Sequence, residues 1–373
     1  MKLNIDTLSI EEKVSLALRG VYEQFGYKRF KMSKFEEYSL YSENKSFLSS
    51  DNIITFNDLD GKLMALKPDV TLSIAKNAKA LSSELEKLYY IENVYRLDKN
   101  TKKYREINQM GLEAIGAIKG YTTIEVIMLA LKSLKEIDSK FVLDISSVAF
   151  VTGLIESLHL TDYAIKDELF ACIVSKNLHD LKRLVDKLDL STEESKKLSK
   201  LITINGGFSK AIKSAKEIIS NEEMRLAVEE LEAVYKVIEN TEFEDKLRLD
   251  FSIINDTNYY NGIIFQGYVS RIPRAVLSGG RYDKLLAKFN KNCSAIGFAL
   301  YLNEINSYYH NLSQNDIDVL ILYDKTTNIA KLYLEVEQLV KSGKSVFTAT
   351  KIPSDIKFNA IMAMSSDKIR EVK

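Results

Sequence analysis

The amino-acid sequence predicts an α+β fold: an antiparallel sheet with flanking helices, a helical insertion and a small C-terminal α/β unit. Two long segments rich in Tyr, Ile and Val, residues 87–98 and 104–116, are joined by a short polar loop, a pattern typical of paired antiparallel strands. Residues 160–245 are rich in Lys and Glu, contain no proline and divide into short amphipathic pieces. Beyond residue 315, strand and helix patterns alternate.

The first domain is predicted over residues 1–310. It opens with a helix over 9–25, where Ser9 and Glu12 fit a capping box and apolar residues recur at helical spacing. After the strand pair, the sequence predicts a helix and then a strand, over 121–136 and 140–146. Strand patterns return after the insertion, so the same sheet resumes there. These later strands are predicted over 247–253, 258–268 and 294–302, with Gly279-Gly280 as a sharp turn.

The insertion over 160–245 is predicted to be entirely helical, and Ser191 followed by Glu194 marks the start of one of its helices. The C-terminal domain is predicted over 316–373 and looks truncated. Its elements are expected in the order strand 317–323, helix 326–342, strand 345–350 and a last apolar stretch over 359–364.

Composition excludes several classes of protein. Apolar residues make up 46% of the chain, and 52 basic residues balance 52 acidic ones, which argues against disorder and against a uniformly basic nucleic-acid binder. Cys172 and Cys293 form neither a CxxC motif nor a disulfide framework. The three histidines, His159, His179 and His310, are scattered over segments that the sequence predicts to be helical and exposed. We therefore expect no metal and no cofactor. No signal peptide and no apolar run of the ~18 residues that span a membrane is visible, so the expected location is cytoplasmic.

A group of polar residues lies on the predicted strands or at their ends. Gln109, Gly111 and Glu113 alternate by two, so on a strand their side chains would share one face, with the glycine leaving space between the other two. Periodicity alone favours the solvated face of an antiparallel sheet. The alternative is a pocket for a small zwitterion. The candidate residues are Asp69, Thr71, Arg96, Gln109, Glu113, Tyr259 and Tyr260.

The segments that carry these residues resemble, in order, the motifs of the catalytic domain of histidyl-tRNA synthetase, a class II aminoacyl-tRNA synthetase fold, over roughly residues 8–305. They are LKPDVT (66–71), the hairpin of 89–116 with Arg96 at the motif 2 arginine, NYYNG (258–262), SGGRYDKL (278–285) and AIGFAL (295–300). The resemblance implies a histidine pocket. In it, Asp69, Thr71 and Gln109 would contact the amino group, and Glu113 and Tyr260 the imidazole.

The sequence departs from the synthetases where they bind ATP. Asn255 and the pair Asn303-Glu304 stand where the family has arginines that hold phosphate and carboxylate charge, and Lys67 and Lys103 also replace arginines. Stabilisation of developing charge by preorganised groups usually contributes more than any other effect to phosphoryl-transfer catalysis. We therefore expect no adenylation and assign no catalytic residue.

Such a domain, with the amino-acid pocket kept and the ATP arginines lost, resembles the regulatory subunits of ATP phosphoribosyltransferase. That resemblance implies a non-catalytic chain that activates a short-form catalytic subunit in the first step of histidine biosynthesis, confers feedback by histidine, and assembles as a hetero-octamer. It also implies a homodimer through residues 26–41, where Met32-Ser33 replaces the usual proline. Two alternatives stay open: a divergent histidyl-tRNA synthetase, and a stand-alone histidine- or tRNA-binding sensor, although the neutral charge disfavours tRNA.

Overall fold

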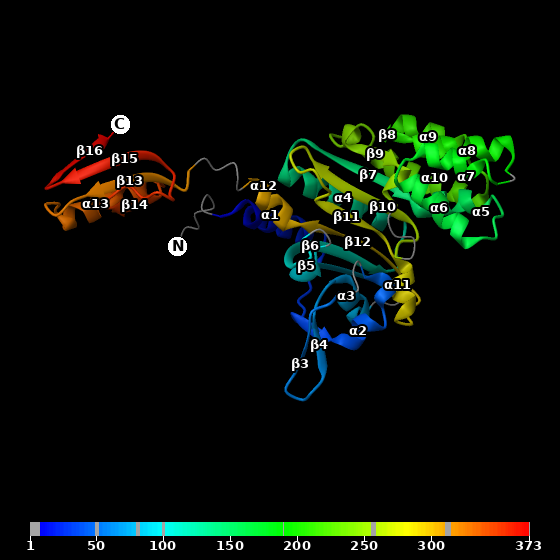
Figure 1. Cartoon of the computed structure of the whole chain (residues 1–373), viewed down its shortest axis with the longest axis horizontal. Coiled ribbons are helices and arrows are strands. Elements are labelled where there is room, and N and C mark those ends of the chain that lie inside the picture. The colour runs from blue at the N-terminus through cyan, green and yellow to red at the C-terminus, as the bar shows by residue number, and fades with distance from the viewer. Residues whose placement is uncertain are drawn as a thin grey trace. The chain divides into compact units, whose positions relative to one another are not determined.

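The computed structural model describes residues 8–48, 52–79, 83–98, 101–188, 190–254, 259–309 and 315–372. The chain divides into two compact units, Met1–Asn306 and Ser307–Lys373 (Figure 1). The predicted α+β class is confirmed. Within the described residues, no helix combines the length and the hydrophobicity needed to cross a lipid bilayer.

One mixed, mostly antiparallel sheet forms the centre of the first unit. Over the described residues its strand order is β1-β5-β6-β12-β11-β10-β7-β9-β8. Only the pairs β1–β5 and β7–β9 in this described sheet are parallel. The strands are β1 (Lys28–Arg29), β5 (Leu85–Leu97), β6 (Tyr104–Gly116), β7 (Phe141–Ser147), β8 (Asn205–Gly207), β9 (Leu247–Asp250), β10 (Ile263–Val269), β11 (Leu277–Arg281) and β12 (Ser294–Tyr301).

The predicted strand pair is confirmed as the longest hairpin of the described sheet. β5 and β6 pair from Leu85 opposite Gly116 to Leu97 opposite Tyr104. The chain reverses in the polar segment between them, whose residues 99 and 100 lie outside the described residues. The β-branched and aromatic residues that fill both strands pack well on a pleated surface, so local preference and tertiary structure agree here.

Two long helices cover one face of the sheet and leave the other for the pocket. α1 (Ile10–Gln24) begins with the predicted capping box, in which Ser9 and Glu12 cap each other. Its buried Tyr22 lies edge-on to Phe298 of β12, with 6.2 Å between the ring centroids. α4 (Gly120–Ile137) buries a continuous apolar stripe and packs so closely that a side chain at Gly267 of β10 would come within 2.7 Å of Leu134.

The predicted insertion consists mainly of helices, which form a group beside β7 and β9 (Figure 1). Ser191 and Glu194 form the capping box of α8, as predicted. The expectation of an entirely helical segment is wrong at β8, because Gly206 has a φ of +116° that a helix cannot accept, and the segment pairs with β9 instead. The helices from β7 onward are α5 (Val148–Glu156), α6 (Tyr163–Val174), α7 (Leu178–Val185), α8 (Thr192–Thr203), α9 (Phe208–Lys216) and α10 (Glu222–Ile238).

One strand prediction and one turn prediction are corrected. The strand predicted over 247–253 ends at Asp250, because the Asp250 carboxylate accepts a hydrogen bond from the Ser252 amide at 2.9 Å and starts a 3₁₀ turn over Phe251–Ile253. The predicted turn at Gly279-Gly280 is a strand interior. A Cβ on Gly279 would come within 2.3 Å of the Gly297 carbonyl oxygen, so these glycines allow close strand packing and form no turn.

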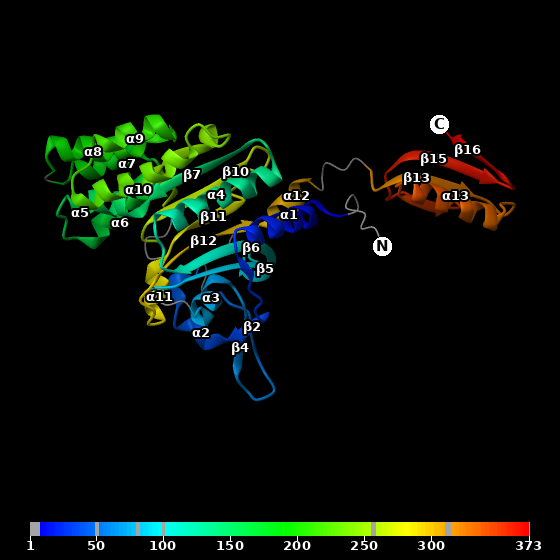
Figure 2. The ribbon, with the colours of Figure 1, turned by 180° about the vertical axis from the view of Figure 1, so that it is seen from behind.

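A small second sheet of the first unit, in the order β2-β4-β3, projects from the body in both views (Figures 1 and 2). It lies within residues 35–66, directly before the LKPDVT segment. Short helices flank it and another follows β11. These elements are β2 (Phe35–Glu37), α2 (Tyr38–Ser42), the 3₁₀ turn Lys45–Phe47, β3 (Thr55–Asn57), β4 (Leu63–Leu66), α3 (Thr71–Asn77) and α11 (Asp283–Lys288).

The second unit has the sheet order β14-β13-β15-β16, with one helix packed against Val319 and Ile321. The predicted order of strand, helix and strand is confirmed. The last apolar stretch forms a further strand, and the strand that follows it was not predicted. α12 (Leu302–Tyr309) precedes the unit's sheet. The other elements are β13 (Ile317–Tyr323), α13 (Ile329–Lys341), β14 (Val346–Ala349), β15 (Phe358–Ser365) and β16 (Lys368–Val372).

Candidate functional site

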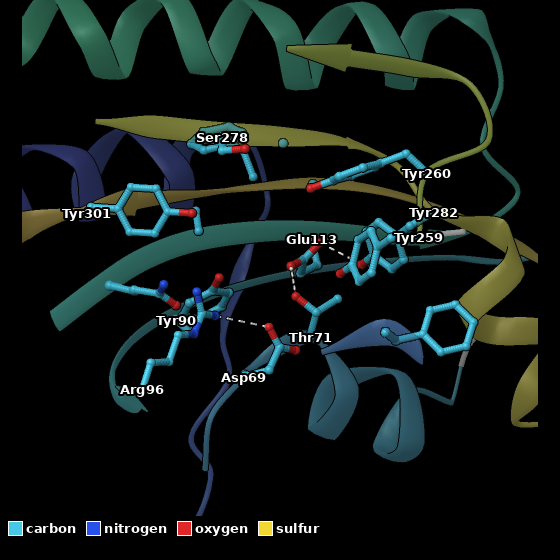
Figure 3. A pocket seen from close by; sticks show the side chains of 16 residues that line it. Asp69, Thr71, Tyr90, Arg96, Glu113, Tyr259, Tyr260, Ser278, Tyr282 and Tyr301 are labelled. Carbon is cyan, nitrogen blue, oxygen red and sulfur yellow. Dashed lines mark hydrogen bonds and ion pairs between the residues drawn. The ribbon is translucent and has the colours of Figure 1, made fainter. Parts of the chain in front are cut away.

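A cavity of about 170 Å³ lies on the face of the main sheet opposite α4, above β6, β11 and β12 (Figure 3). It is smaller than the ~300–1,000 Å³ of pockets for drug-sized ligands, which suits a small polar molecule. All seven residues singled out from the sequence line it. The lining also includes Phe47, Tyr90, Ser278, Gly279, Tyr282, Gly297, Phe298, Ala299 and Tyr301, none of which was selected from the sequence.

The strand alternation on β6 points Gln109 and Glu113 into this cavity. Each is 2% exposed, so the interpretation of a solvated sheet face is wrong. The expected space at Gly111 is not empty, because the Tyr90 ring of β5 fills it. A Cβ on Gly111 would lie 2.5 Å from that ring and 2.4 Å from the Phe298 carbonyl oxygen. The glycine therefore lets Tyr90 cross the strand and form part of the pocket lining.

Glu113 is the buried carboxyl group at the base of the cavity. It accepts hydrogen bonds from the Tyr282 hydroxyl at 2.6 Å and from the Thr71 hydroxyl at 3.2 Å (Figure 3). Burial raises the pKa of Glu113 to about 8. The two hydroxyl donors lower this pKa, and the negative charge of Asp69 raises it further. Only glycine fits opposite, since a Cβ on Gly297 would lie 1.8 Å from a Glu113 carboxylate oxygen. A ligand that brings an N–H donor or a positive charge favours the ionised carboxylate and is bound with release of a proton.

Asp69 and Arg96 form a charge pair at the other end of the cavity. The Arg96 Nη2 lies 3.4 Å from the Asp69 Oδ2, and the Arg96 Nε donates to the Pro68 carbonyl oxygen at 2.7 Å. The other Asp69 oxygen accepts from the Leu72 amide at 2.9 Å, at the start of α3. Burial raises the pKa of Asp69, and the Arg96 guanidinium opposes that rise. Among the described lining residues, Arg96 is the only basic side chain.

Aromatic rings form one wall of the cavity, which extends to Phe47 of the 3₁₀ turn Lys45–Phe47. The strand predicted over 258–268 begins only at Ile263, so Tyr259 and Tyr260 lie on the loop before β10. Their ring centroids are 4.6 Å apart, and Tyr259 lies 5.7 Å from Tyr282 and 6.2 Å from Phe47. Tyr282 lies within the motif SGGRYDKL and Tyr90 within the hairpin of 89–116, so both could have been selected, whereas nothing in the sequence marked Phe47 or Tyr301.

The positions where synthetases carry phosphate-binding arginines make other contacts here. The Asn303 side chain bonds the backbone of β6 at Asn108 and at Glu106. Glu304 pairs with Arg274, with 3.2 Å between Oε2 and Nε. Lys67 is 1% exposed and its ammonium is paired with Glu92. Asn255 lies outside the described residues.

Among the described residues, no three or more His, Cys, Asp or Glu side chains come together in a way that could hold a metal ion. His159 lies in a turn with a φ of +53°, not in the predicted helix, and is exposed. His179 is exposed on α7 as predicted, and His310 lies outside the described residues. Cys172 and Cys293 are free thiols.

The raised pKa of Glu113 predicts how folding stability depends on pH. A carboxyl group with a folded-state pKa of about 8 and a usual value near 4.5 stabilises the fold below pH 4.5, and that contribution is lost as pH rises through 8. Glu113→Gln removes this loss. Urea unfolding at pH 6 and pH 8 should show a decline in unfolding free energy that is smaller in the variant by about 2–3 kcal/mol.

The exposed Glu193→Gln on α8 is the matched control for this titration. It should leave the wild-type pH dependence unchanged. An equal decline in wild type and Glu113→Gln would contradict a proton held at Glu113.

The chain is similar to known proteins by family model, by sequence and by structure. The family model described as histidyl-tRNA synthetase matches residues 4–305. Proteins named ATP phosphoribosyltransferase regulatory subunit are 32% identical in Thermoanaerobacter pseudethanolicus, over 90% of this chain and 89% of the relative, and 34% identical in Caldanaerobacter subterraneus subsp. tengcongensis, over 80% and 77%.

Solved structures share the fold. An ATP phosphoribosyltransferase regulatory subunit/histidyl-tRNA synthetase from Bacillus halodurans superposes with a TM-score of 0.75 at 24% identity, covering 95% of this chain and 94% of that one. Histidyl-tRNA synthetase from Nostoc sp. PCC 7120 gives 0.70 at 18% identity, over 100% and 97%. A chain of an ATP phosphoribosyl transferase complex from Thermotoga maritima gives 0.61 at 17% identity, over 78% and 97%.

Proposed function

This chain belongs to the histidyl-tRNA synthetase family and, within it, to the regulatory subunits of ATP phosphoribosyltransferase, and from that premise we propose that free histidine is the effector its pocket binds. The chain is a regulatory subunit and is not itself catalytic. Its partner is the catalytic subunit of ATP phosphoribosyltransferase, the enzyme of the first step of histidine biosynthesis. The alternative of a divergent synthetase is thereby set aside.

The observation that carries the proposal is that a small cavity holds a buried carboxyl group, Glu113, together with a half-buried pair of a carboxyl group and a guanidinium, Asp69 and Arg96. Asp69, Thr71 and Gln109 offer oxygens to an ammonium group, and Arg96 offers the one basic group of the described lining to a carboxylate. Glu113 and Tyr260 lie where they can order an imidazole ring (Figure 3). A zwitterion with a polar ring can make hydrogen bonds with each of these groups, whereas a purely apolar ligand would exclude water from them and offer no hydrogen bond in return.

The surroundings of this pocket offer little to a nucleotide triphosphate. Glu304 already occupies Arg274, and a carboxylate there repels phosphate oxygens. Since loss of one preorganised donor typically costs ~2.7–4 kcal/mol of transition-state stabilisation, binding of histidine without its activation is the function that this site supports.

We also propose that the chain forms a homodimer and that the dimer joins catalytic subunits in a hetero-octamer, in the cytoplasm, where the free thiols would stay reduced. Support for the dimer comes from the small sheet β2-β4-β3, whose first strand lies within residues 26–41. Phe35, Phe56 and Leu63 are 46%, 38% and 46% exposed there, and Leu59 is fully exposed. An apolar patch of this kind typically marks a protein interface.

Light scattering tests the assembly. The chain alone should have about twice its 42.5 kDa mass, and a larger species should form when a short-form catalytic subunit is added. Phe56→Asp should shift the chain alone toward monomer, because a charge would be buried at the contact. Tyr163→Asp, at a residue 80% exposed on α6, is the control and should stay dimeric. A monomeric wild type, or separate masses after mixing, would contradict the proposed assembly.

A further inference from the structure

Arg281, at the end of β11, makes contacts just outside the pocket that the binding of histidine does not itself require. Its Nε pairs with the Asp283 carboxylate at 2.8 Å, and its Nη2 donates to the Ser294 hydroxyl at 3.0 Å. The third guanidinium nitrogen lies 4.0 Å from the Glu230 carboxylate of α10. One planar guanidinium therefore faces α11, the start of β12 and the helical insertion together.

The loop that carries Tyr259 and Tyr260 is hydrogen-bonded to Arg281 and Asp283. The Asn261 amide donates to the Arg281 carbonyl oxygen at 3.1 Å. The Asn261 side chain donates to Asp283 at 3.2 Å and accepts from its amide at 2.8 Å. Gly262 gives space to the arginine, since a Cβ there would lie 3.0 Å from the Arg281 Cδ.

The pocket wall begins directly beside these contacts. Tyr282, the next residue after Arg281, donates to Glu113. Tyr260 packs so close to Gly280 that a Cβ on that glycine would lie 2.8 Å from its ring. The orientation of three wall tyrosines thus depends on how the loop and the end of β11 are joined.

We propose that Arg281 is a positioning residue of the pocket: through Asp283 and Asn261 it fixes the wall formed by Tyr259, Tyr260 and Tyr282, and through Glu230 it gives the helical insertion a part in supporting that wall. The inference rests on the proposed function only where it concerns histidine. The Glu230 carboxylate is half-buried. Asp283 accepts hydrogen bonds from the Ala295 amide and from Arg281, so it is held by both β12 and β11.

Arg281→Met tests the positioning role, because methionine keeps an unbranched apolar side chain and removes the guanidinium. Nitration of individual tyrosines, followed by peptide mass analysis without any ligand, should rise several-fold at Tyr259 and Tyr260 and stay constant at the distant, exposed Tyr163. Calorimetry should show histidine affinity lowered about tenfold or more, because wall tyrosines that are no longer held in place must be ordered when the ligand binds. Arg281→Lys should fall between wild type and Arg281→Met in both measurements.

Arg225→Met on α10 is the matched control, since Arg225 is exposed and pairs only with Glu222 and Glu229 of its own helix among the described residues. Unchanged nitration of the wall in both Arg281 variants would overturn the inference, as would a uniform rise at all tyrosines, which would mean general loss of the fold. If wild type fails to bind histidine while nitration responds as expected, the proposed function fails and the positioning role stands.

Discussion

Asp69→Asn is expected to lower the affinity for histidine by roughly tenfold to a hundredfold, because a hydrogen bond to a charged group contributes about 1.5–3 kcal/mol. The substitution is nearly isosteric. Its amide oxygen can still accept from the Leu72 amide, which is the contact that Asp69 makes with the start of α3. The change therefore removes the charge offered to the ligand's ammonium and the ion pair with Arg96, and it keeps the contact with α3.

Calorimetry with two ligands isolates that interaction. Wild type should prefer histidine over imidazolepropionate, which lacks only the amino group, and Asp69→Asn should lose most of that preference. Asp180→Asn, the same change on an exposed part of α7, is the control and should keep the wild-type preference. An undiminished preference in Asp69→Asn would mean that the ammonium lies elsewhere.

Much of the fold could be predicted from the sequence because local signals and tertiary structure agree in those segments. The capping boxes at Ser9 and Ser191 bond within one helical turn. The long hairpin has strand-forming residues on both sides and a polar reversal between them. In such segments the residues that specify an element are also those that form it.

The predictions failed where a distant segment decides the local structure. Gly279-Gly280 is a turn signal by itself, yet the carbonyl oxygen of Gly297 and the ring of Tyr260 lie where their side chains would be, so the pair serves in a strand. Tyr90 enters the pocket only because Gly111, on the neighbouring strand, has no side chain. No periodicity within one segment carries such information.

Only part of the candidate pocket could be predicted from the sequence, because contacts between distant segments also form it. Gln109 and Glu113 share a face by strand alternation, which a sequence can show, and they are 2% exposed because other elements cover them, which it cannot. Asp69 and Thr71 were chosen by motif and not by pattern. Their contacts with Arg96 and Glu113 join segments more than 25 residues apart, since Asp69 and Arg96 are separated by 27 positions and Thr71 and Glu113 by 42.

The proposed function requires the pocket and the catalytic subunit to be thermodynamically linked. A ligand bound here changes the partner's activity only if its affinity differs between two states of the complex, and that coupling is typically 1–3 kcal/mol, or about 5–150-fold. We expect the phosphoribosyl transfer rate of a short-form catalytic subunit to rise when this chain is added. Histidine should then lower it.

The histidine inhibition curve of phosphoribosyl transfer by the mixed subunits is the most direct test. The proposed function predicts activation by the wild-type chain, inhibition by histidine that the catalytic subunit alone does not show, and a shift of the curve to about tenfold or higher histidine concentration with Asp69→Asn. A rate that neither rises on addition of the chain nor falls with histidine, or an inhibition curve that Asp69→Asn leaves in place, would contradict it.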